Sequence, residues 1–331
     1  MMVQFLKNRA LTFIVLGLLG TVPLLMFWSG SDYLSLATKL VCLCIAATSL
    51  NLILGYGGMV SFGHAVFFGI GAYAVGIPAY HSVYGGMDLI ATSNGFFHIG
   101  FAIVLAALFA LITGAISLRT KGIHFIMITL AFSQMMFYFL LSLDTYGGDD
   151  GLTIDERSQL PFISLDNSVH MFLLSFGALL ICLYMVHRIV NSRFGLVLQG
   201  AKDNEERMAA IGYNTFAYRL TAYVISGAMC GLAGALFANS ESFVFPELID
   251  WTRSGELIFM VILGGGGTII GPVIGGIVFI VLEDVLSRFT IYWHLPFGIM
   301  LILAVLLGRT GIANWFKSDG AIKKPAEGNH E

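Results

Sequence analysis

Two polar side chains at helical spacing stand inside a long apolar part of the chain and could do chemistry together. Ser61 and His64 lie three residues apart, so on a helix they would share one face. A serine activated by a base is a nucleophile, and rhomboid-type intramembrane proteases use one. Those enzymes need a Gly-x-Ser-Gly turn and a histidine on another helix, and the sequence shows neither. We therefore expect His64 to hydrogen-bond backbone groups freed by nearby glycines, with direct contact to a substrate as the alternative.

The sequence also lacks the residue patterns that bind nucleotides, metals or cofactors. No Gly-x-x-x-x-Gly-Lys-Ser/Thr phosphate loop occurs, and the glycine run 264–267 has no lysine after it. The chain therefore cannot hydrolyse ATP alone. We expect no enzyme activity, no bound cofactor and no metal. Four cysteines lie within apolar runs, as is typical of small core residues: Cys42, Cys44, Cys182 and Cys230.

Ionisable side chains within the apolar runs are few. The deep candidates are His64 and Lys39, while Glu283 and Asp284 stand near the outer end of their run. Carriers driven by ion gradients usually hold carboxylates, histidine or lysine within their spans. If the chain carries a solute, this scarcity favours an ATP-driven pathway over ion coupling, and an ion-coupled secondary transporter is the alternative.

A polar segment, residues 200–212, lies between two long apolar runs and has the pattern of a short capped helix. Asp203 is predicted to be the N-cap, Glu206 completes a capping box, and Gly212 suits the left-handed position after the helix. We predict that this helix docks on a partner protein, and a solvated loop helix without a partner is the alternative. Its assigned residues are the caps, the acidic pair that complements the helix dipole and an apolar pair on one face: Asp203, Asn204, Glu205, Glu206, Met208, Ile211 and Gly212.

Composition places the chain in a lipid bilayer. Of the 331 residues, 57% are hydrophobic and only 11% are charged, and mean hydropathy is +0.85. About a quarter of the residues of a soluble domain are charged. No basic patch suggests a nucleic-acid partner. Because a chain in lipid must satisfy its backbone internally, we expect an all-α, polytopic bundle of transmembrane helices.

Apolar runs long enough to cross a bilayer recur along the chain. Lys and Arg, which mark the cytoplasmic side, gather in alternate loops and place the N-terminus inside, while the acidic loops 81–99, 144–167 and 239–254 lie outside. Nine full spans would leave the basic C-terminus outside. We therefore predict that the stretch Leu257–Gly267 crosses as an irregular tenth segment and turns at its glycines. The full runs lie near 11–28, 34–54, 62–80, 100–118, 122–143, 168–190, 216–238, 269–287 and 291–308.

Two glycine-rich stretches predict broken helices. The first covers residues 55–73, and the second is the glycine run that starts at Gly264 and Gly265. Glycines at membrane depth serve close helix packing or a broken helix that lines a solute path, and both remain open for the first stretch. Irregular backbone must be covered by protein or a wet cavity, so we expect the second turn at the centre of the molecule. The predicted path-lining residues are Asn51, Tyr56, Ser61, His64, Phe67, Tyr73, Gly264 and Gly265.

Three sequence blocks, in this order, resemble one family. They are residues 50–73, with Gly-Tyr-Gly-Gly-Met-Val-Ser-Phe-Gly-His; residues 194–213, followed by Gly231–Ala238; and residues 260–275, with Leu-Gly-Gly-Gly-Gly-Thr-Ile-Ile-Gly-Pro. Together they look like the LivM-type permease of branched-chain amino acid ABC importers, whose relatives carry urea and short amides. The likeness covers nearly the whole chain.

The resemblance implies a multi-pass protein of the bacterial inner membrane, with a permease domain over residues 1–315 and a disordered polar tail at 316–331. Both termini would be cytoplasmic. The implied partners are a sister permease in a heterodimer, two cytoplasmic ATPase subunits that use ATP and magnesium, and a periplasmic amino-acid binding protein. In the family, the segment that matches Asp203–Gly212 docks on an ATPase. The sequence departs at Gly200–Lys202, where relatives often have a more basic run. The implied cargo is leucine, isoleucine or valine, with urea or a short amide as the alternative.

Overall fold

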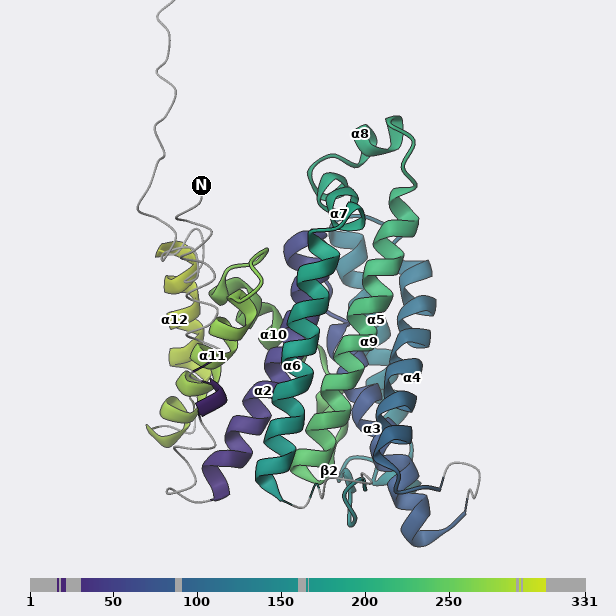
Figure 1. Ribbon diagram of the computed structural model, residues 1–331, viewed down its shortest axis with the longest axis vertical. Helices are drawn as coiled ribbons and strands as arrows, with labels where there is room; N and C mark the ends of the chain where they lie inside the picture. Colours follow the sequence, from purple (N-terminus) through teal and green to yellow (C-terminus); the bar gives the residue numbers. More distant parts are fainter. Residues whose placement is uncertain are drawn as a thin grey trace, which may run out of the picture.

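The chain forms a bundle of long helices in the computed structural model, which describes residues 17, 19–21, 31–86, 91–159, 165, 167–289, 292 and 294–307. Figure 1 shows α7 and α8 at one end of the bundle and β2 at the other. These ends are called the α8 end and the β end below. The predicted span near 11–28 lies largely outside the described residues, and the predicted tail 316–331 lies wholly outside them.

Six of the described helices are long and apolar enough to cross a membrane, fewer than the nine to ten predicted segments. The helices after α9 are not among these six. α10 and α12 are shorter, and α11 carries three charged residues. In chain order the elements are α2 Ser31–Asn51, a π-helical turn η1 Leu52–Tyr56, α3 His64–Tyr84, α4 Gly95–Ser117, α5 Ile123–Leu141, η2 Asp144–Tyr146, β1 Leu152–Thr153, α6 Ser168–Val190, α7 Arg193–Asp203, α8 Glu205–Ala210, α9 Thr215–Glu241, β2 Phe243–Val244, η3 Pro246–Ile249, α10 Trp251–Gly264, α11 Gly271–Phe289 and α12 His294–Leu307.

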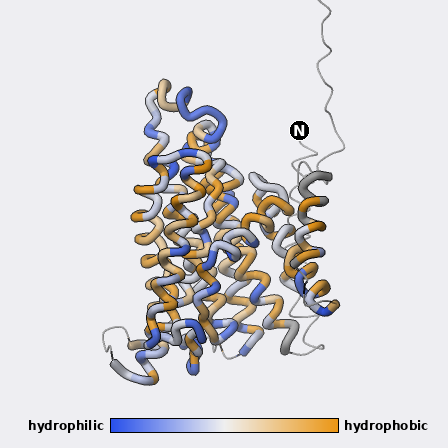
Figure 2. The backbone as a smooth tube through the Cα atoms, turned by 180° about the vertical axis from the view of Figure 1, so that it is seen from behind, coloured by the Kyte–Doolittle hydropathy of each residue, from blue (hydrophilic) through white to orange (hydrophobic). Residues whose placement is uncertain are grey.

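Burial separates central helices from peripheral ones. The apolar window of α2 and η1 is 89% buried, whereas the windows of α4 and α5 are 28% and 22% buried. The exposed residues of α4 are largely apolar, including Val104, Leu108 and Ile112. Figure 2 shows hydrophobic colours along the helices and hydrophilic ones concentrated at the two ends, most clearly at the α8 end. An apolar belt between two polar ends is the pattern expected of a membrane protein.

Small residues bring α9 against its neighbours. A Cβ atom at Gly234 would meet the carbonyl oxygen of Phe68 in α3, and one at Gly231 would meet the Cβ of Ala106 in α4. A Cβ at Gly71 of α3 would in turn meet the backbone of Gly231. Such contacts let helix backbones approach closely, which is how helices associate in lipid. Close packing is therefore one use of the first glycine-rich stretch.

Broken helices are the other use, and the structure confirms both predicted breaks. The first break begins at the π-helical turn that follows α2 and lasts until α3 starts at His64. The second separates α10 from α11, and there Gly265 and Gly267 have φ of +99° and +80°, a region that favours glycine. Since α10 ends and α11 begins at this turn, the chain reverses there as predicted.

The segment between α9 and α10 differs from its prediction as part of an outer loop, 239–254. The chain leaves α9 at the β end, where β2 pairs antiparallel with β1, and then turns back into the bundle through η3. The hydroxyl of Ser133, in the middle of α5, donates to the carbonyl of Ile249 at 2.7 Å. The start of α10 therefore lies level with the middle of α5.

Candidate functional site

The polar segment forms two short helices rather than one. α7 runs through Asp203, so the predicted N-cap belongs to the preceding helix. Asn204 caps α8 instead, because its backbone is extended and its side-chain oxygen accepts from the N–H of Arg207 at 2.9 Å. Gly212 has φ of +96° and follows the helix as predicted. We define α8 and the turn at Ile211 and Gly212 as the handle.

The predicted apolar pair of the handle divides into one inward and one outward residue. Met208 lies against Gly200 of α7, since a Cβ at that glycine would meet its sulfur. Ile211 is 65% exposed, and Glu206 is exposed as well. The handle thus exposes an isoleucine and a carboxylate for which no partner is found within the described part of the chain.

Glu205 fastens the handle to the helices below it. Its carboxylate accepts from Lys121 at 2.8 Å, from Arg219 at 3.1 Å and from the hydroxyl of Thr215 at 3.0 Å. Burial alone would raise the pKa of Glu205, but the hydrogen bond from Lys121 and the positive charge of Arg219 outweigh it and hold this pKa below its usual value. Arg219 also donates to the carbonyl of Ala201 at 3.0 Å. The handle is thus joined to the start of α9 and to the loop before α5.

Lys202, at the end of α7, connects the polar segment to the first helix break. Its ammonium donates to the carbonyl of Gly55 at 2.7 Å. Its methylene stem lies over Gly58, where a Cβ would meet it. In the π-helical turn this carbonyl lies outside the regular α-helical hydrogen-bond pattern, and the lysine ammonium donates to it.

Asn51 connects the first break to the second. This residue ends α2 and has no exposed surface. Its side-chain amide donates to the carbonyl of Thr268 at 2.8 Å, and its side-chain oxygen accepts from the N–H of Gly267 at 2.9 Å. One buried side chain therefore holds two backbone groups of the second turn. We call the set Asn51, Gly55, Lys202, Gly267 and Thr268 the junction.

The other predicted path residues lie inside the bundle. Tyr56, Phe67 and Tyr73 are 8% exposed or less. Gly264 and Gly265 are buried as well, at the turn between α10 and α11. These residues are covered by the chain's own side chains in this conformation, so a solute could reach them only after the helices move.

Ser61 and His64 do not share a helix face, contrary to the predicted spacing. Ser61 lies in the irregular segment of the first break, and His64 is the first residue of α3. The partner of the His64 ring is the hydroxyl of Ser49, at 2.9 Å from Nε2, and not the freed backbone that we expected. The described structure thus shows no serine–histidine pair of the kind that a protease would need at these two residues.

Sequence reasoning missed a polar group at the start of α10, because it placed this segment in an outer loop. The amide of Gln134 donates to Asp250 at 2.7 Å, and the hydroxyl of Thr252 donates to the same carboxylate at 2.6 Å. One turn on, Arg253 pairs with Glu256 at 2.6 Å. The signal for this site was the pair of charges Asp250 and Arg253 immediately before an apolar run.

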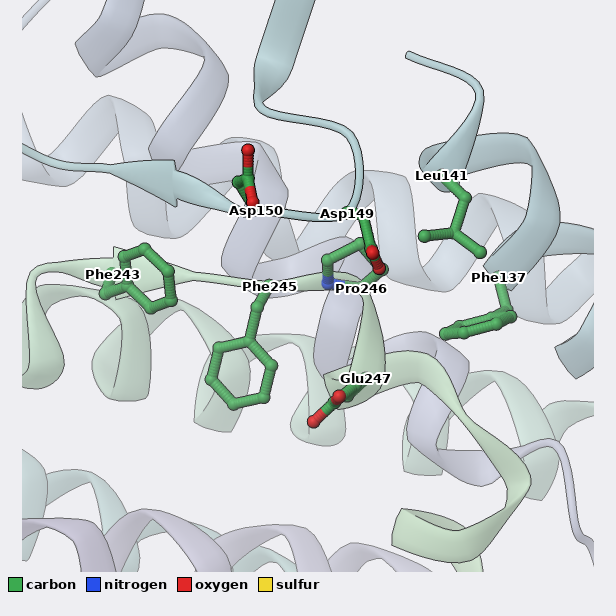
Figure 3. A pocket seen from close by; sticks show the side chains of 8 residues that line it. All are labelled: Phe137, Leu141, Asp149, Asp150, Phe243, Phe245, Pro246 and Glu247. Atoms are coloured by element: carbon green, nitrogen blue, oxygen red, sulfur yellow. The ribbon is translucent and has the colours of Figure 1, made fainter. Parts of the chain in front are cut away.

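A pocket of about 330 Å³ opens at the β end, between the end of α5 and the segment that turns back into the bundle (Figure 3). Aromatic rings and carboxylates line it together. The lining residues are Phe137, Leu141, Asp149, Asp150, Phe243, Phe245, Pro246 and Glu247.

Comparison with known proteins identifies the family. Residues 33–306 match the model described as "Branched-chain amino acid transport system / permease component". The chain is 23% identical to the high-affinity branched-chain amino acid transport system permease protein LivM of Escherichia coli K12, over 86% of this chain and 71% of that protein. It is 25% identical to a probable branched-chain amino acid transport permease protein LivM of Methanocaldococcus jannaschii, over 88% of this chain and 92% of that protein.

A further relative has another named cargo. The autoinducer 2 import system permease protein LsrC of Yersinia pseudotuberculosis YPIII is 27% identical, over 63% of this chain and 62% of that protein. No solved structure matches the chain. Since the family model spans most of the described bundle, including both helix breaks and the handle, the chain belongs to the family of permease components of branched-chain amino acid transport systems.

Proposed function

We propose that this chain is the membrane permease subunit of an ABC importer that moves leucine, isoleucine and valine inward, driven by two separate ATPase subunits. A sister permease would complete the transmembrane pathway, and an extracytoplasmic binding protein would deliver the cargo. The single observation that carries the proposal is the link from an outward-facing handle to both helix breaks through Lys202 and Asn51. Family membership supports the importer class and the cargo.

Charge supports the orientation in which the α8 end faces the cytoplasm. Lys121, Arg207 and Arg219 lie at the α8 end, whereas Asp149 and Glu247 line the pocket at the β end. Basic residues favour the cytoplasmic side of a membrane protein. ATPase subunits are cytoplasmic, so this orientation presents the handle to them and the acidic pocket to the arriving cargo.

The junction explains how movement of the handle would open a path. When ATP closes the motor dimer, a shift of the handle displaces α7, and Lys202 transmits the shift to Gly55. Asn51 then carries it to Gly267 and Thr268 in the second break. Irregular, glycine-rich backbone can change its torsion angles without breaking a regular helix, so the helices on either side can re-pack. The chain itself supplies the conduit, and the partner subunits supply the energy.

Two substitutions on the outer surface of the handle test this role. In Glu206→Lys with Ile211→Asp, both side chains are exposed, so the permease should still insert and fold. We expect the ATPase subunits to co-purify at less than about a tenth of the wild-type amount, because a charge reversal and a buried charge at an interface core together exceed 1.4 kcal/mol. The matched control is Glu156→Lys, the same charge change on an exposed residue at the β end.

Undiminished recovery of the ATPase subunits and undiminished leucine uptake in the handle variant would show that the motor does not dock there. Loss of recovery in the Glu156→Lys control as well would show that the handle variant reports a general charge effect and not docking.

A further inference from the structure

Asp250 places a carboxylate deep within the apolar part of the bundle. Gln134, which holds it, stands about 10 Å from one end of α5 and about 16 Å from the other at ~1.5 Å per residue. The hydrocarbon core of a bilayer is about 30 Å thick. An ionisable group at this depth must face protein or a water-filled cavity, because lipid cannot solvate it.

The described partners of Asp250 are neutral. Its two carboxylate oxygens accept from the amide of Gln134 and from the hydroxyl of Thr252. None of the four ion pairs formed by the described residues includes Asp250. Its side chain is half-buried and Thr252 is exposed, so the carboxylate can be reached from outside the chain. Asp250 stands at the N-terminus of α10, whose backbone N–H groups offset its charge only in part. A carboxylate without a full positive charge beside it at membrane depth attracts a cationic group.

Arg253 offers the complementary charge one helical turn away. The backbone N–H of Arg253 donates to the carbonyl of Asp250 at 3.1 Å, which fixes the spacing of the two residues. Of its five guanidinium N–H donors, one bonds Glu256 at 2.6 Å, and the side chain keeps 21% of its surface exposed. A guanidinium with spare donors binds carboxylates well. Asp250 and Arg253 do not pair with each other among the ion pairs of the described residues.

The pocket at the β end is lined by residues close in sequence to this site. The pocket in Figure 3 is lined by Phe137, which lies three residues from Gln134 on α5, and by Glu247, which lies three residues before Asp250. Its volume of about 330 Å³ is within the range of small-molecule pockets, about 300–1,000 Å³. Phenyl rings suit an aliphatic side chain, and carboxylates suit an ammonium group.

We propose that Asp250 and Arg253 form the cargo-binding site within the membrane, where Asp250 holds the ammonium group and Arg253 the carboxylate of a zwitterionic amino acid. The pocket at the β end is the vestibule from which cargo reaches it. The proposal rests on the proposed function, because it takes the cargo to be an amino acid. The rival occupant of the same polar face is a polar side chain of the sister permease, and the experiment below separates the two.

The test measures leucine binding to the purified full importer in nanodiscs, without the binding protein. Trp251 lies between Asp250 and Thr252 and is 44% exposed, so its fluorescence serves as the reporter, taken as the difference from a Trp251→Phe importer. We expect Asp250→Asn and Arg253→Gln each to weaken leucine binding by about tenfold or more. The matched control is the exposed pair on α11, Asp284→Asn and Arg288→Gln, where binding should not change.

Two analogues assign the charges separately. Asp250→Asn should leave the weak binding of 4-methylpentanoate, which has no amine, unchanged. Arg253→Gln should leave the weak binding of isoamylamine, which has no carboxylate, unchanged. Arg253→Lys keeps the charge and should restore part of the leucine binding, which separates a binding defect from misfolding.

Leucine binding that is unchanged in both single variants would overturn the proposal. Loss of the sister permease from the purified complex in both variants would overturn it too, and would assign the polar face to the subunit contact. Failure of the proposed function has a different signature, namely that the wild-type importer with its binding protein accumulates no leucine when supplied with ATP.

Discussion

Lys202 is the residue through which the polar segment reaches the membrane part of the protein. Its ammonium bonds a carbonyl of the π-helical turn after α2, and its position at the end of α7 puts it beside the handle. A charge-assisted hydrogen bond of this kind contributes about 1.5–3 kcal/mol. A side chain without a donor at this position would lose the hydrogen bond to Gly55, although α7 would still pack against the turn.

We expect Lys202→Met to uncouple ATP hydrolysis from transport. Methionine keeps the apolar stem over Gly58 but cannot donate to Gly55. The ATPase subunits should co-purify normally, while leucine uptake per ATP hydrolysed falls by about tenfold, the equivalent of about 1.4 kcal/mol. The measurement is paired uptake and phosphate release in proteoliposomes.

The control for Lys202→Met is Lys121→Met, which also removes one cation near the handle. Lys121 is 67% exposed and Glu205 keeps its pair with Arg219, so little should change. An unchanged ratio of uptake to hydrolysis in Lys202→Met would show that the hydrogen bond from Lys202 to Gly55 does not transmit the movement of the handle.

At the residue scale, the sequence does not predict which of two chemically similar neighbours makes a given hydrogen bond. Asp203 and Asn204 both cap helices well, and their order in the chain does not say which one does. The choice is made by α7, a helix that the polar pattern did not reveal and that continues through Asp203. In the same way, His64 has several possible hydroxyl and backbone partners, and only the packing of α2 against α3 selects Ser49.

At the scale of elements, the close contact of α9 with α3 organises the bundle around the breaks. Gly234 meets the carbonyl of Phe68 so closely that even one added methyl group must displace the backbone. We expect Gly234→Ala to destabilise the permease by about 1–3 kcal/mol, the usual cost of overpacking. The check is thermal unfolding of the purified permease, followed by size-exclusion chromatography after heating.

The matched control for that substitution is Gly177→Ala in α6, where nothing lies within 4 Å of the added Cβ atom. Since alanine also favours helix more than glycine does, this variant should be neutral or slightly stabilised. If the two variants unfold at the same temperature, the α3–α9 contact is looser than the structure shows.

Helices with long apolar runs were predictable from the sequence. The segment that turns back into the bundle between α9 and α10 was not. The runs near 34–54, 168–190 and 216–238 correspond to α2 with its π-helical turn, α6 and α9. The turn back into the bundle before α10 mixes Asp250 and Arg253 with apolar residues and is too short to register as a span. Its depth is set by contacts with α3 and α5, such as the bond from Ser133 to Ile249, and no local pattern encodes those contacts. A buried, half-polar segment of this kind is typical of transport sites.

On the scale of the whole molecule, polar groups lie at the two ends and at two places within the bundle. The handle and its cations lie at the α8 end and the acidic pocket lies at the β end. Within the bundle lie the polar group of Asp250 with Gln134 and the junction. This arrangement suits the proposed permease, in which cargo enters at the β end and the ATPase subunits move the handle at the α8 end. The glycine blocks predicted the breaks, but their contact through Asn51 joins residues more than 200 positions apart and became visible only in the fold.

Transport in proteoliposomes tests the central claim most directly, namely that this chain is a passive conduit moved by ATPase subunits through the handle. Radiolabelled leucine uptake is compared between vesicles with the purified chain alone, under a proton or sodium gradient, and vesicles with the sister permease, the ATPase subunits, the binding protein and ATP. We predict accumulation only in the complete system, and only with ATP on the side of the α8 end. Accumulation of leucine by the chain alone under an ion gradient would contradict the account.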